Sequence, residues 1–300
     1  MKKVNDINGW LVIDKPVGIS SAQVVGRLKY VLHPSKIGHA GTLDPLASGV
    51  LPIALGKATR TIEFVMDGMK EYEFEVSWGS QTTTDDAEGM VCATSNHRPT
   101  QADILAVLPR FMGQIEQMPP AYSALKVNGQ RAYDLARTGQ AVSLKPRPVL
   151  IEKLALLDVG DDERGLEKSR FRVRCSKGTY VRSLGRDLGL ALGCYGFISV
   201  LRRTKCEPFS VSQALVLDAV TPDCLSIIPM ERALEKVPAL LVDEISARRL
   251  CQGQRLNLRT IGLVAPVQNG IVRVLLNNRV IGLALLEKGV LHPHKMFECV

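Results

Sequence analysis

Residues 170–192 read RFRVRCSKGTYVRSLGRDLGLAL, a strand pattern followed directly by a helix pattern. Phenylalanine, valine and cysteine alternate with three arginines over residues 170–175, and a strand places such alternate residues on opposite faces. Leucines then recur at the spacing of one helix face, and Gly193 is a typical stop. We therefore predict a strand over residues 170–175 and a helix over Ser183–Leu192.

The same two patterns recur elsewhere in the chain without a repeating strand–helix unit. Glutamates alternate with Tyr72, Phe74 and Val76, which indicates a half-buried strand. A capping box at residues 20–23 precedes one of the helical patterns. The remaining predicted elements are a strand over Gly9–Asp14 and helices over Ser21–Leu32 and Thr100–Met112. Because strands and helices mix irregularly, we predict an α+β fold with a mainly antiparallel sheet.

The C-terminal part of the chain has a different pattern. Pro229–Pro238 is the best candidate for a linker, and short strands are predicted after it over Gly270–Leu276 and Val280–Leu286. Asn277-Asn278 between these strands is a plausible hairpin turn. We therefore predict a main domain over residues 1–236 and a small, β-rich, barrel-like domain over residues 237–300.

The net charge of the chain is +8, and its location is more informative than its size. Residues 170–205 hold nine basic residues and one acidic residue, whereas the rest of the chain holds 29 of each. A concentrated basic surface indicates a polyanionic partner, which could be a nucleic acid, an anionic membrane or a phosphorylated small molecule. A charged face that contacts only solvent is the alternative.

Several protein classes lose their usual signatures. The seven cysteines form no CxxC pair and are odd in number, which argues against a zinc ribbon or a disulfide framework and favours free thiols in a reducing cytoplasm. The N-terminus lacks the core of a signal peptide, and no apolar run approaches the ~18 residues of a membrane helix. Phosphate-loop, dinucleotide and HExxH motifs are absent, and His292-Pro293-His294 has no further metal ligands nearby. We expect a cytoplasmic protein without a metal or cofactor.

The segment GHAGTLDPLASG, residues 38–49, is the strongest candidate for a functional loop. Its glycines allow the backbone to approach a ligand closely, while the loop presents a single carboxylate, Asp44. An aspartate before proline often only shapes an Asx turn. With no metal and no partner acid, it could instead act as a nucleophile or a general base.

This loop lies in a longer segment with a known counterpart. Residues 38–59, GHAGTLDPLASGVLPIALGKAT, strongly resemble the catalytic loop of the tRNA pseudouridine synthase B (TruB) family. Six further motifs similar to those of the family follow the family order, and with the loop they identify the chain as a member of it. They are LVIDKPVGISS at Leu11–Ser21, Lys70-Glu71-Tyr72, the Thr82-x-Thr84-x-Asp86-x-x-Gly89 stretch, QMPPAYSALK at Gln117–Lys126, CSKGTYVRS at Cys175–Ser183 and VLRR at Val200–Arg203.

The resemblance implies both a fold and a reaction. The fold is a pseudouridine synthase catalytic domain followed by a PUA-like RNA-binding domain. The substrate is tRNA, in which uridine 55 of the T loop becomes pseudouridine after it is flipped out of its stack. The N1–C1′ bond breaks, the base rotates and C5 bonds to C1′, so that no cofactor is needed.

The resemblance also implies which residues act on the base. Asp44 is the essential nucleophile, and whether it attacks C1′ or removes a proton from C2′ stays open. Arg182 pairs with Asp44 and holds it oriented. Tyr72 and Tyr180 pack around the flipped uracil, and Tyr72 belongs to the catalytic set. Leu201 forms an apolar wall of the same pocket.

Other residues are expected to hold the surrounding RNA. His39 displaces or stacks against T-loop bases, and Lys15 and Arg202 are expected to bind the substrate. Basic side chains would contact phosphates, which position an RNA without reading its sequence. The phosphate contacts we expect are Lys126, Arg131, Arg137, Arg172, Arg174, Arg202 and Arg203.

Three alternatives to a tRNA-modifying enzyme remain at this stage. The chain could be an RNA chaperone that remodels the tRNA elbow, or a related synthase that acts on another RNA. A membrane-surface protein is the poorest alternative, because no basic amphipathic helix or lipidation signal occurs. An intact Asp44 and Arg182 favour catalysis. We expect a monomer without a protein partner.

Overall fold

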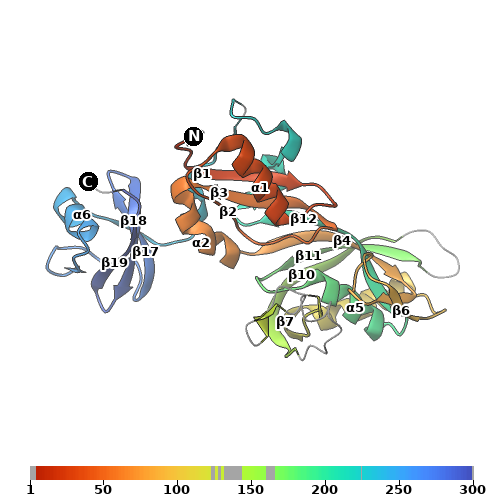
Figure 1. Ribbon diagram of the computed structural model, residues 1–300. Coiled ribbons are helices and arrows are strands. Elements are labelled where there is room, and N and C mark those ends of the chain that lie inside the picture. The colour runs from red at the N-terminus through yellow and green to blue at the C-terminus, as the bar shows by residue number, and fades with distance from the viewer. Residues whose placement is uncertain are drawn as a thin grey trace.

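The computed structural model of the chain describes residues 5–122, 126–127, 130–131, 144–159, 166–223 and 225–298. A larger part is built on one long twisted sheet, and a smaller β-rich module follows at the C-terminal end (Figure 1). Arg137, an expected phosphate contact, lies outside the described residues, and only the backbone is described at Lys126 and Arg131. No helix in the described part of the chain is both long enough and apolar enough to cross a membrane.

Ten strands form the main sheet over the described residues, and two of its pairings are parallel, β1 with β14 and β3 with β12. The mainly antiparallel sheet predicted from the sequence is therefore confirmed. In sheet order, the strands are β14 (Leu215–Val216), β1 (Gly9–Lys15), β3 (Ala47–Leu55), β12 (Gly196–Cys206), β4 (Lys70–Trp78), β11 (Lys168–Cys175), β10 (Arg147–Val159) and β7 (Gly113–Gln117), with β2 (Ile37–His39) on β3 and β13 (Phe209–Ser210) on β12.

The shorter elements lie around this sheet. Two small ribbons pair β5 (Ser80–Thr82) with β6 (Val91–Thr94) and β8 (Lys126–Val127) with β9 (Gln130–Arg131). Among the described residues of the larger part, the helices are α1 (Ser21–Leu32), α2 (Ile62–Asp67), α3 (Gln101–Val107) and α5 (Val181–Ala191). The 3₁₀ turns are η1 (Gly56–Thr61), η2 (Leu108–Phe111), η3 (Val211–Gln213), η4 (Leu217–Ala219) and η5 (Met230–Leu234).

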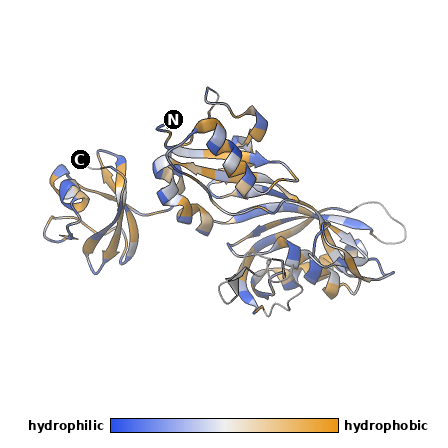
Figure 2. Cartoon of the chain, in the orientation of Figure 1, coloured by the Kyte–Doolittle hydropathy of each residue, from blue (hydrophilic) through white to orange (hydrophobic). Residues whose placement is uncertain are grey.

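The alternating residues of β4 and β11 explain why the centre of the sheet forms. The strands are antiparallel and in register, so Phe171 lies opposite Phe74, and the two rings stack with centroids 5.2 Å apart. These buried rings belong to the main core, together with leucines of α5, whereas the charged residues of both strands lie on the other face. Figure 2 shows hydrophobic residues along the strands of both parts of the chain.

The helices follow their predicted signals, with small shifts at their ends. Ser20 caps α1 in a capping box with Gln23, as predicted. The predicted helix Thr100–Met112 continues past Val107 only as the 3₁₀ turn η2, because Pro109 cannot donate the next helical hydrogen bond. The helix predicted from Ser183 begins two residues earlier, at Val181.

The C-terminal module is a five-stranded sheet with one helix, α6 (Glu244–Cys251). Asn277 and Asn278 both have positive φ and close the hairpin that the sequence predicts. The proposed division between residues 236 and 237 falls between η5 and β15. The strands in sheet order are β15 (Ala239–Leu241), β17 (Gly270–Leu276), β18 (Arg279–Glu287), β19 (Val290–Met296) and β16 (Leu256–Asn257).

The module packs against η1 and α2 of the larger part. Phe64 of α2 contacts a buried cluster that includes Phe297. Lys295 Nζ lies 2.6 Å from Glu63 Oε1, and Arg60 donates to the carbonyl of Met296. Helix α2 therefore lies between the C-terminal module and the sheet (Figure 1).

Candidate active site

A cavity of about 330 Å³ opens where the loop between β2 and β3 meets the start of α5. The loop contributes Asp44, and β4 and β12 contribute further walls. Lys15, His39 and Arg202 are not among the described residues that line it. The lining includes Leu43, Asp44, Met66, Lys70, Tyr72, Tyr180, Arg182, Leu201 and Arg203.

Asp44 and Arg182 form an ion pair at this cavity, with Asp44 Oδ2 2.9 Å from Arg182 Nη2. The Asp44 side chain is 40% exposed, whereas that of Arg182 is 8% exposed. The guanidinium is thus fixed inside the protein and holds a carboxylate that remains open to the cavity. Such a pair orients the carboxylate and offsets its charge. The structure brings together the two residues that the sequence singled out.

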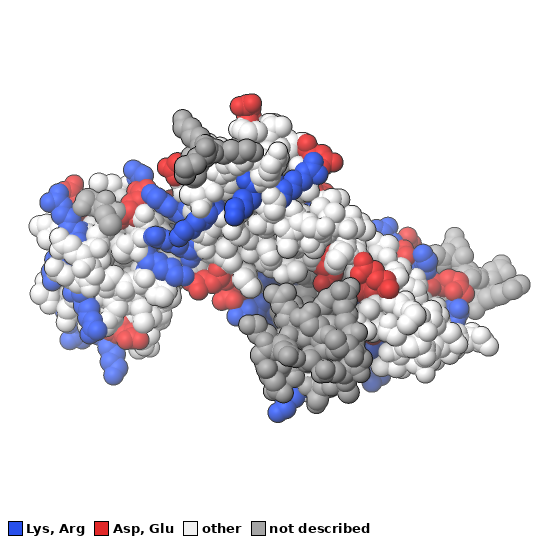
Figure 3. Space-filling model, viewed as in Figure 1, with Lys and Arg blue, Asp and Glu red and all other residues white. Residues whose placement is uncertain are grey.

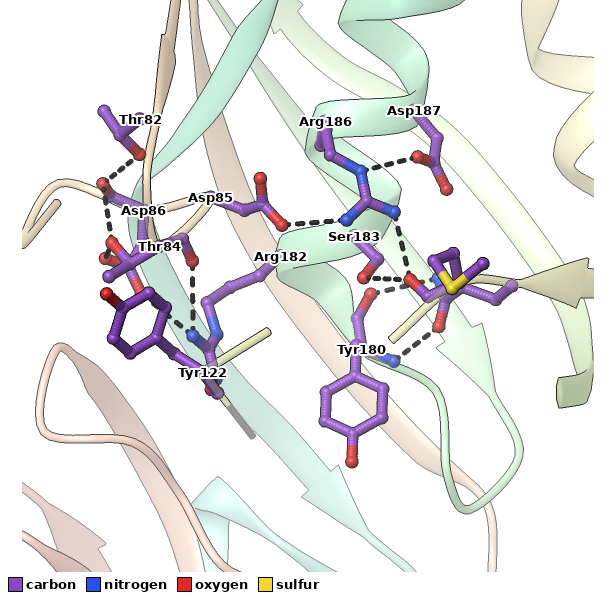
Figure 4. A network of polar contacts seen from close by, with 12 residues as sticks. Thr82, Thr84, Asp85, Asp86, Tyr122, Tyr180, Arg182, Ser183, Arg186 and Asp187 are labelled. Carbon is purple, nitrogen blue, oxygen red and sulfur yellow. Dashed lines mark hydrogen bonds and ion pairs between the residues drawn. The ribbon is translucent and has the colours of Figure 1, made fainter. Parts of the chain in front are cut away.

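A second carboxylate, from Asp86, fixes the other side of Arg182 (Figure 4). Asp86 Oδ2 lies 3.4 Å from Arg182 Nη1, and the same nitrogen donates to the carbonyl of Thr84 at 3.2 Å. Arg182 Nη2 also donates to the carbonyl of Tyr122 at 3.0 Å. These contacts explain why the guanidinium can stay buried, because carboxylates and carbonyls surround it.

The Thr-x-Thr-x-Asp-x-x-Gly stretch builds the turn that carries Asp86. Thr84 Oγ1 and the backbone N–H of Glu88 both donate to Asp86 Oδ1, and Thr82 Oγ1 donates to its carbonyl. A Cβ on Gly89 would lie 2.4 Å from Thr84 Oγ1, so this turn requires glycine. Sequence reasoning found the motif but missed that its aspartate would hold Arg182.

Tyr180 is placed on the cavity by a side chain from a distant strand. Gln117, at the end of β7, accepts from the Tyr180 backbone N–H at 2.8 Å and donates to its carbonyl at 3.1 Å. Ser183 and Arg186 then bind the carbonyl of Met118 (Figure 4). These bonds tie β7 to the first turn of α5, which the sequence alone did not indicate.

Tyr72 and Leu201 line the cavity from neighbouring strands, as expected. Burial raises the pKa of Tyr72 to about 12, against an opposing effect of the Arg203 guanidinium, to which its side chain is hydrogen-bonded. The phenol therefore keeps its proton at neutral pH. It can present its ring to a base and donate a hydrogen bond, but it does not act as a base there.

Arg203 has a structural role, and its expected contact with an RNA phosphate stays a prediction. Its side chain is buried and donates from Nε to the carbonyl of Val50 at 2.7 Å and from Nη2 to that of Gly41 at 2.9 Å. Gly49 packs directly on the Arg203 backbone with φ +103°. These contacts hold both ends of the loop that carries Asp44.

Lys15 is also buried, and its contacts give it a positioning role, while its expected contact with substrate stays a prediction. Its ammonium donates to the carbonyls of Pro16 at 2.8 Å, Ile19 at 2.7 Å and Pro45 at 3.4 Å. Burial lowers the pKa of Lys15 to about 8, and the negative charge of Asp44 partly opposes this shift. Lys15 therefore ties the first turn of the chain to the residue after Asp44.

Lys70 acts in a similar way on the opposite wall. Its buried ammonium donates to the carbonyls of Val65, Met66 and Gly68 and so caps the end of α2. Burial lowers the pKa of Lys70. Lys177, across the cavity, forms an ion pair of 2.7 Å with Asp67 at the end of the same helix.

His39 and Arg202 lie outside the cavity. His39 is half-buried at the end of β2, its Nδ1 has no hydrogen-bond partner within the described part of the chain, and burial lowers its pKa. Arg202 donates from both terminal nitrogens to the Asp14 carboxylate, at 3.0 and 2.7 Å. Neither side chain therefore lines the cavity, and the RNA contacts that the resemblance implies for them stay predictions.

The basic residues of 170–205 do not form a surface of excess positive charge. The register of β11 between β4 and β10 places glutamates beside them, and Arg172 pairs with Glu73 at 2.6 Å. Arg174 pairs with Glu152 and Glu207. We call this face the ion-pair ladder. Its remaining pairs are Lys168 with Glu75, Lys205 with Glu71 and Arg202 with Asp14.

Comparison with known proteins gives this site its class. The TruB family pseudouridylate synthase N-terminal domain matches residues 29–181, the tRNA pseudouridylate synthase B C-terminal domain matches residues 182–235, and the C-terminal domain of pseudouridine synthase II TruB matches residues 238–297. A chain in the crystal structure of a Cbf5-Nop10-Gar1 complex has a TM-score of 0.73 and 25% identity, over 97% of this chain and 85% of that one. The fold and these matches define a pseudouridine synthase, which is an isomerase.

Relatives of known name narrow this class to one family. The tRNA pseudouridine synthase B of Bradyrhizobium diazoefficiens is 49% identical, over 97% of this chain and 86% of its own length. That of Rhodospirillum rubrum is 48% identical, over 96% of this chain and 95% of its own length. The chain belongs to the tRNA pseudouridine synthase B (TruB) family.

Proposed function

We propose that this protein converts uridine 55 in the T loop of tRNA to pseudouridine, with Asp44 as the nucleophile. The observation that carries the proposal is the Asp44 carboxylate, which is open to the cavity and held by a buried guanidinium. The relatives named tRNA pseudouridine synthase B support tRNA as the substrate. The cavity lies within the volume range of small-ligand sites, as an extruded nucleotide requires.

The side chains around the cavity suit each step of the isomerisation. The N1–C1′ bond breaks and the Asp44 carboxylate, poised by Arg182, either bonds to C1′ or takes the proton from C2′. The detached uracil turns between Tyr72 and Leu201, which offer a ring face and an apolar wall. C5 then bonds to C1′ as the Asp44 carboxylate leaves C1′ or, in the other route, as the proton returns to C2′. The proton on C5 is lost and N1 gains one, so atoms and electrons balance without a cofactor.

The test is pseudouridine formation in an unmodified tRNA transcript, mapped to the nucleotide. We expect product at uridine 55 with the wild-type protein and none with Asp44→Asn, which keeps the size of the side chain but loses its charge. Asp218→Asn is the matched control, because Asp218 is a highly exposed aspartate with only a surface ion pair to Arg27. Product at another nucleotide would contradict the substrate position.

Turnover by Asp44→Asn would contradict the assigned nucleophile. Salt-sensitive tRNA binding with no product from the wild type would remove the enzymatic proposal for tRNA and leave an RNA chaperone. The binding assay on the same samples separates these outcomes, because Asp44→Asn is expected to bind the transcript as the wild type does.

A further inference from the structure

A second group of basic residues lies on a different face from the ion-pair ladder. Residues 21–61 contain five basic residues and one acidic residue, Asp44. The basic residues come from α1, the segment before β2 and η1, which pack on one another. Figure 3 shows Lys and Arg atoms gathered over this region and over the facing part of the C-terminal module. The five basic residues of 21–61 are Arg27, Lys29, Lys36, Lys57 and Arg60.

A hollow of about 340 Å³ lies within this region, between the end of α1 and η1. We call it the lysine hollow. Lys29 and Lys36 stand on its rim, both are exposed, and no carboxylate lines it among the described residues. Its remaining walls are Pro34, Ser35, Ile37 and Thr59.

The two lysines differ from their basic neighbours in having no side-chain partner within the described part of the chain. Arg27 pairs with Asp218, Lys57 lies 3.7 Å from Glu298, and Arg60 donates to a backbone carbonyl. The charge of Lys29 also complements the carbonyl end of α1, because it lies in the last turn of that helix. Together the two ammonium groups leave the lysine hollow with a local positive potential.

The lysine hollow lies on the path between the C-terminal module and the catalytic loop. Lys36 directly precedes β2, and that strand of three residues, about 10 Å long, ends at His39, from which the loop continues to Asp44. On the other side, η1 carries Arg60, which contacts the module. A polyanion that extends from the cavity toward the module would pass the lysine hollow.

We propose that the lysine hollow binds a phosphate of the RNA backbone, in the stem beside the loop whose uridine enters the cavity. Ammonium groups bind phosphate as point charges, and such contacts hold an RNA in place without reading its sequence. The proposal rests on the proposed function and adds to it the surface on which the stem lies. It also moves the main electrostatic contact away from the arginines of the ion-pair ladder.

The experiment compares two double variants with the same change in net charge. Lys29→Ala with Lys36→Ala removes both ammonium groups from the lysine hollow, whereas Lys153→Ala with Lys168→Ala removes two exposed lysines from the face of the ion-pair ladder. Both are measured for binding of a T-arm stem-loop over a range of salt and for KM and kcat of pseudouridine formation. All four positions are exposed, so both variants are expected to fold, which circular dichroism checks.

We expect the lysine-hollow variant to weaken binding about tenfold and raise KM correspondingly. Each phosphate contact contributes about 0.7 to 0.9 to the slope of log binding constant against log salt concentration, so loss of this one contact should lower the slope by about 1. The ladder variant should stay within about twofold of the wild type. Lys29→Arg with Lys36→Arg should restore binding, because it restores the charge.

Equal effects of the two double variants, or an unchanged KM and salt slope in the lysine-hollow variant, would overturn the proposal. If an acidic protein segment binds the lysine hollow instead of RNA, the lysine-hollow variant should show an unchanged KM and an unchanged salt slope. Failure of the proposed function looks different, because the wild type itself would then form no pseudouridine at uridine 55.

Discussion

Asp86 tests how the buried side of the site is held together. It is 2% exposed and its Oδ2 lies 3.4 Å from Arg182 Nη1, while Oδ1 accepts from Thr84 and from the Glu88 backbone. The substitution Asp86→Asn can keep both bonds to Oδ1. It removes the charge, however, and turns an amide donor toward the guanidinium, which has only donors to offer.

The expected cost follows from the geometry. Coulomb's law with an effective dielectric constant of about 20 gives about 5 kcal/mol at this separation, and loss of one partner of a buried pair costs about 3–5 kcal/mol. Because Arg182 keeps its contact with Asp44, we expect the lower end, about 3 kcal/mol of unfolding free energy. Turnover should also fall by about tenfold or more, since the guanidinium that orients Asp44 loses one of its supports.

Urea unfolding followed by tryptophan fluorescence measures the first effect, and single-turnover pseudouridine formation measures the second. Asp187→Asn is the control, because its side chain is 30% exposed and its partner Arg186 retains Asp85 at 2.9 Å. That variant should lose less than about 1 kcal/mol. Equal losses in the two variants, or a loss below about 1 kcal/mol in Asp86→Asn, would refute the reasoning.

Two further predictions concern the backbone of the loop and the phenol of Tyr72. Gly49→Ala should prevent stable folding, because its Cβ would lie 2.2 Å from the Arg203 carbonyl oxygen, whereas Gly193→Ala, also at positive φ but with open space, should cost only about 1–2 kcal/mol in the same urea assay. Tyr72 is protonated more tightly in the folded chain (pKa about 12) than its ordinary value of 10, so its contribution to stability is constant below pH 10 and is lost as the pH rises toward 12. The wild type should therefore lose about 1.4 kcal/mol more than Tyr72→Phe between pH 9 and 11, and equal losses would contradict the raised pKa of Tyr72.

Local patterns predicted three strands of the main sheet, β1, β4 and β11, but not β3, β10 or β12. Alternation over residues 170–175 and residues 71–76 identified two central strands, and the capping box gave the start of α1 correctly. The start of α5 could not be predicted from the sequence. Val181 and Arg182 belong to the helix, and the residue before them, Tyr180, is held by two backbone hydrogen bonds to the Gln117 side chain. That contact joins residues 63 positions apart, and no local propensity contains it.

The site residues also fall into two groups, those in short contiguous motifs and those whose role depends on residues distant in the sequence. The Gly-rich loop with Asp44 and the motif with Arg182 were found because each is a short contiguous pattern, and the structure places the two side chains together. The roles of Asp86 and of the buried Arg203 depend on neighbours that are distant in the sequence, Arg182 of helix α5 and Val50 of strand β3. Lys15 was expected to bind the substrate, whereas its ammonium donates both to carbonyls of the adjacent turn and to that of Pro45, 30 residues away, which only the fold brings near.

The position of the positive surface charge is the property that the sequence predicts least well, and the reason is geometrical. The basic residues of 170–205 are close together along the chain, but strands β4 and β10 place a glutamate beside many of them, so the excess cancels in space. The five basic residues of 21–61 are more widely spaced along the chain, and α1 and η1, which carry four of them, both pack against β2. A phosphate backbone responds to the potential at a surface, which depends on neighbours in space. The face that holds Lys29 and Lys36 is therefore the better candidate for the RNA stem than the strip that is richest in arginine.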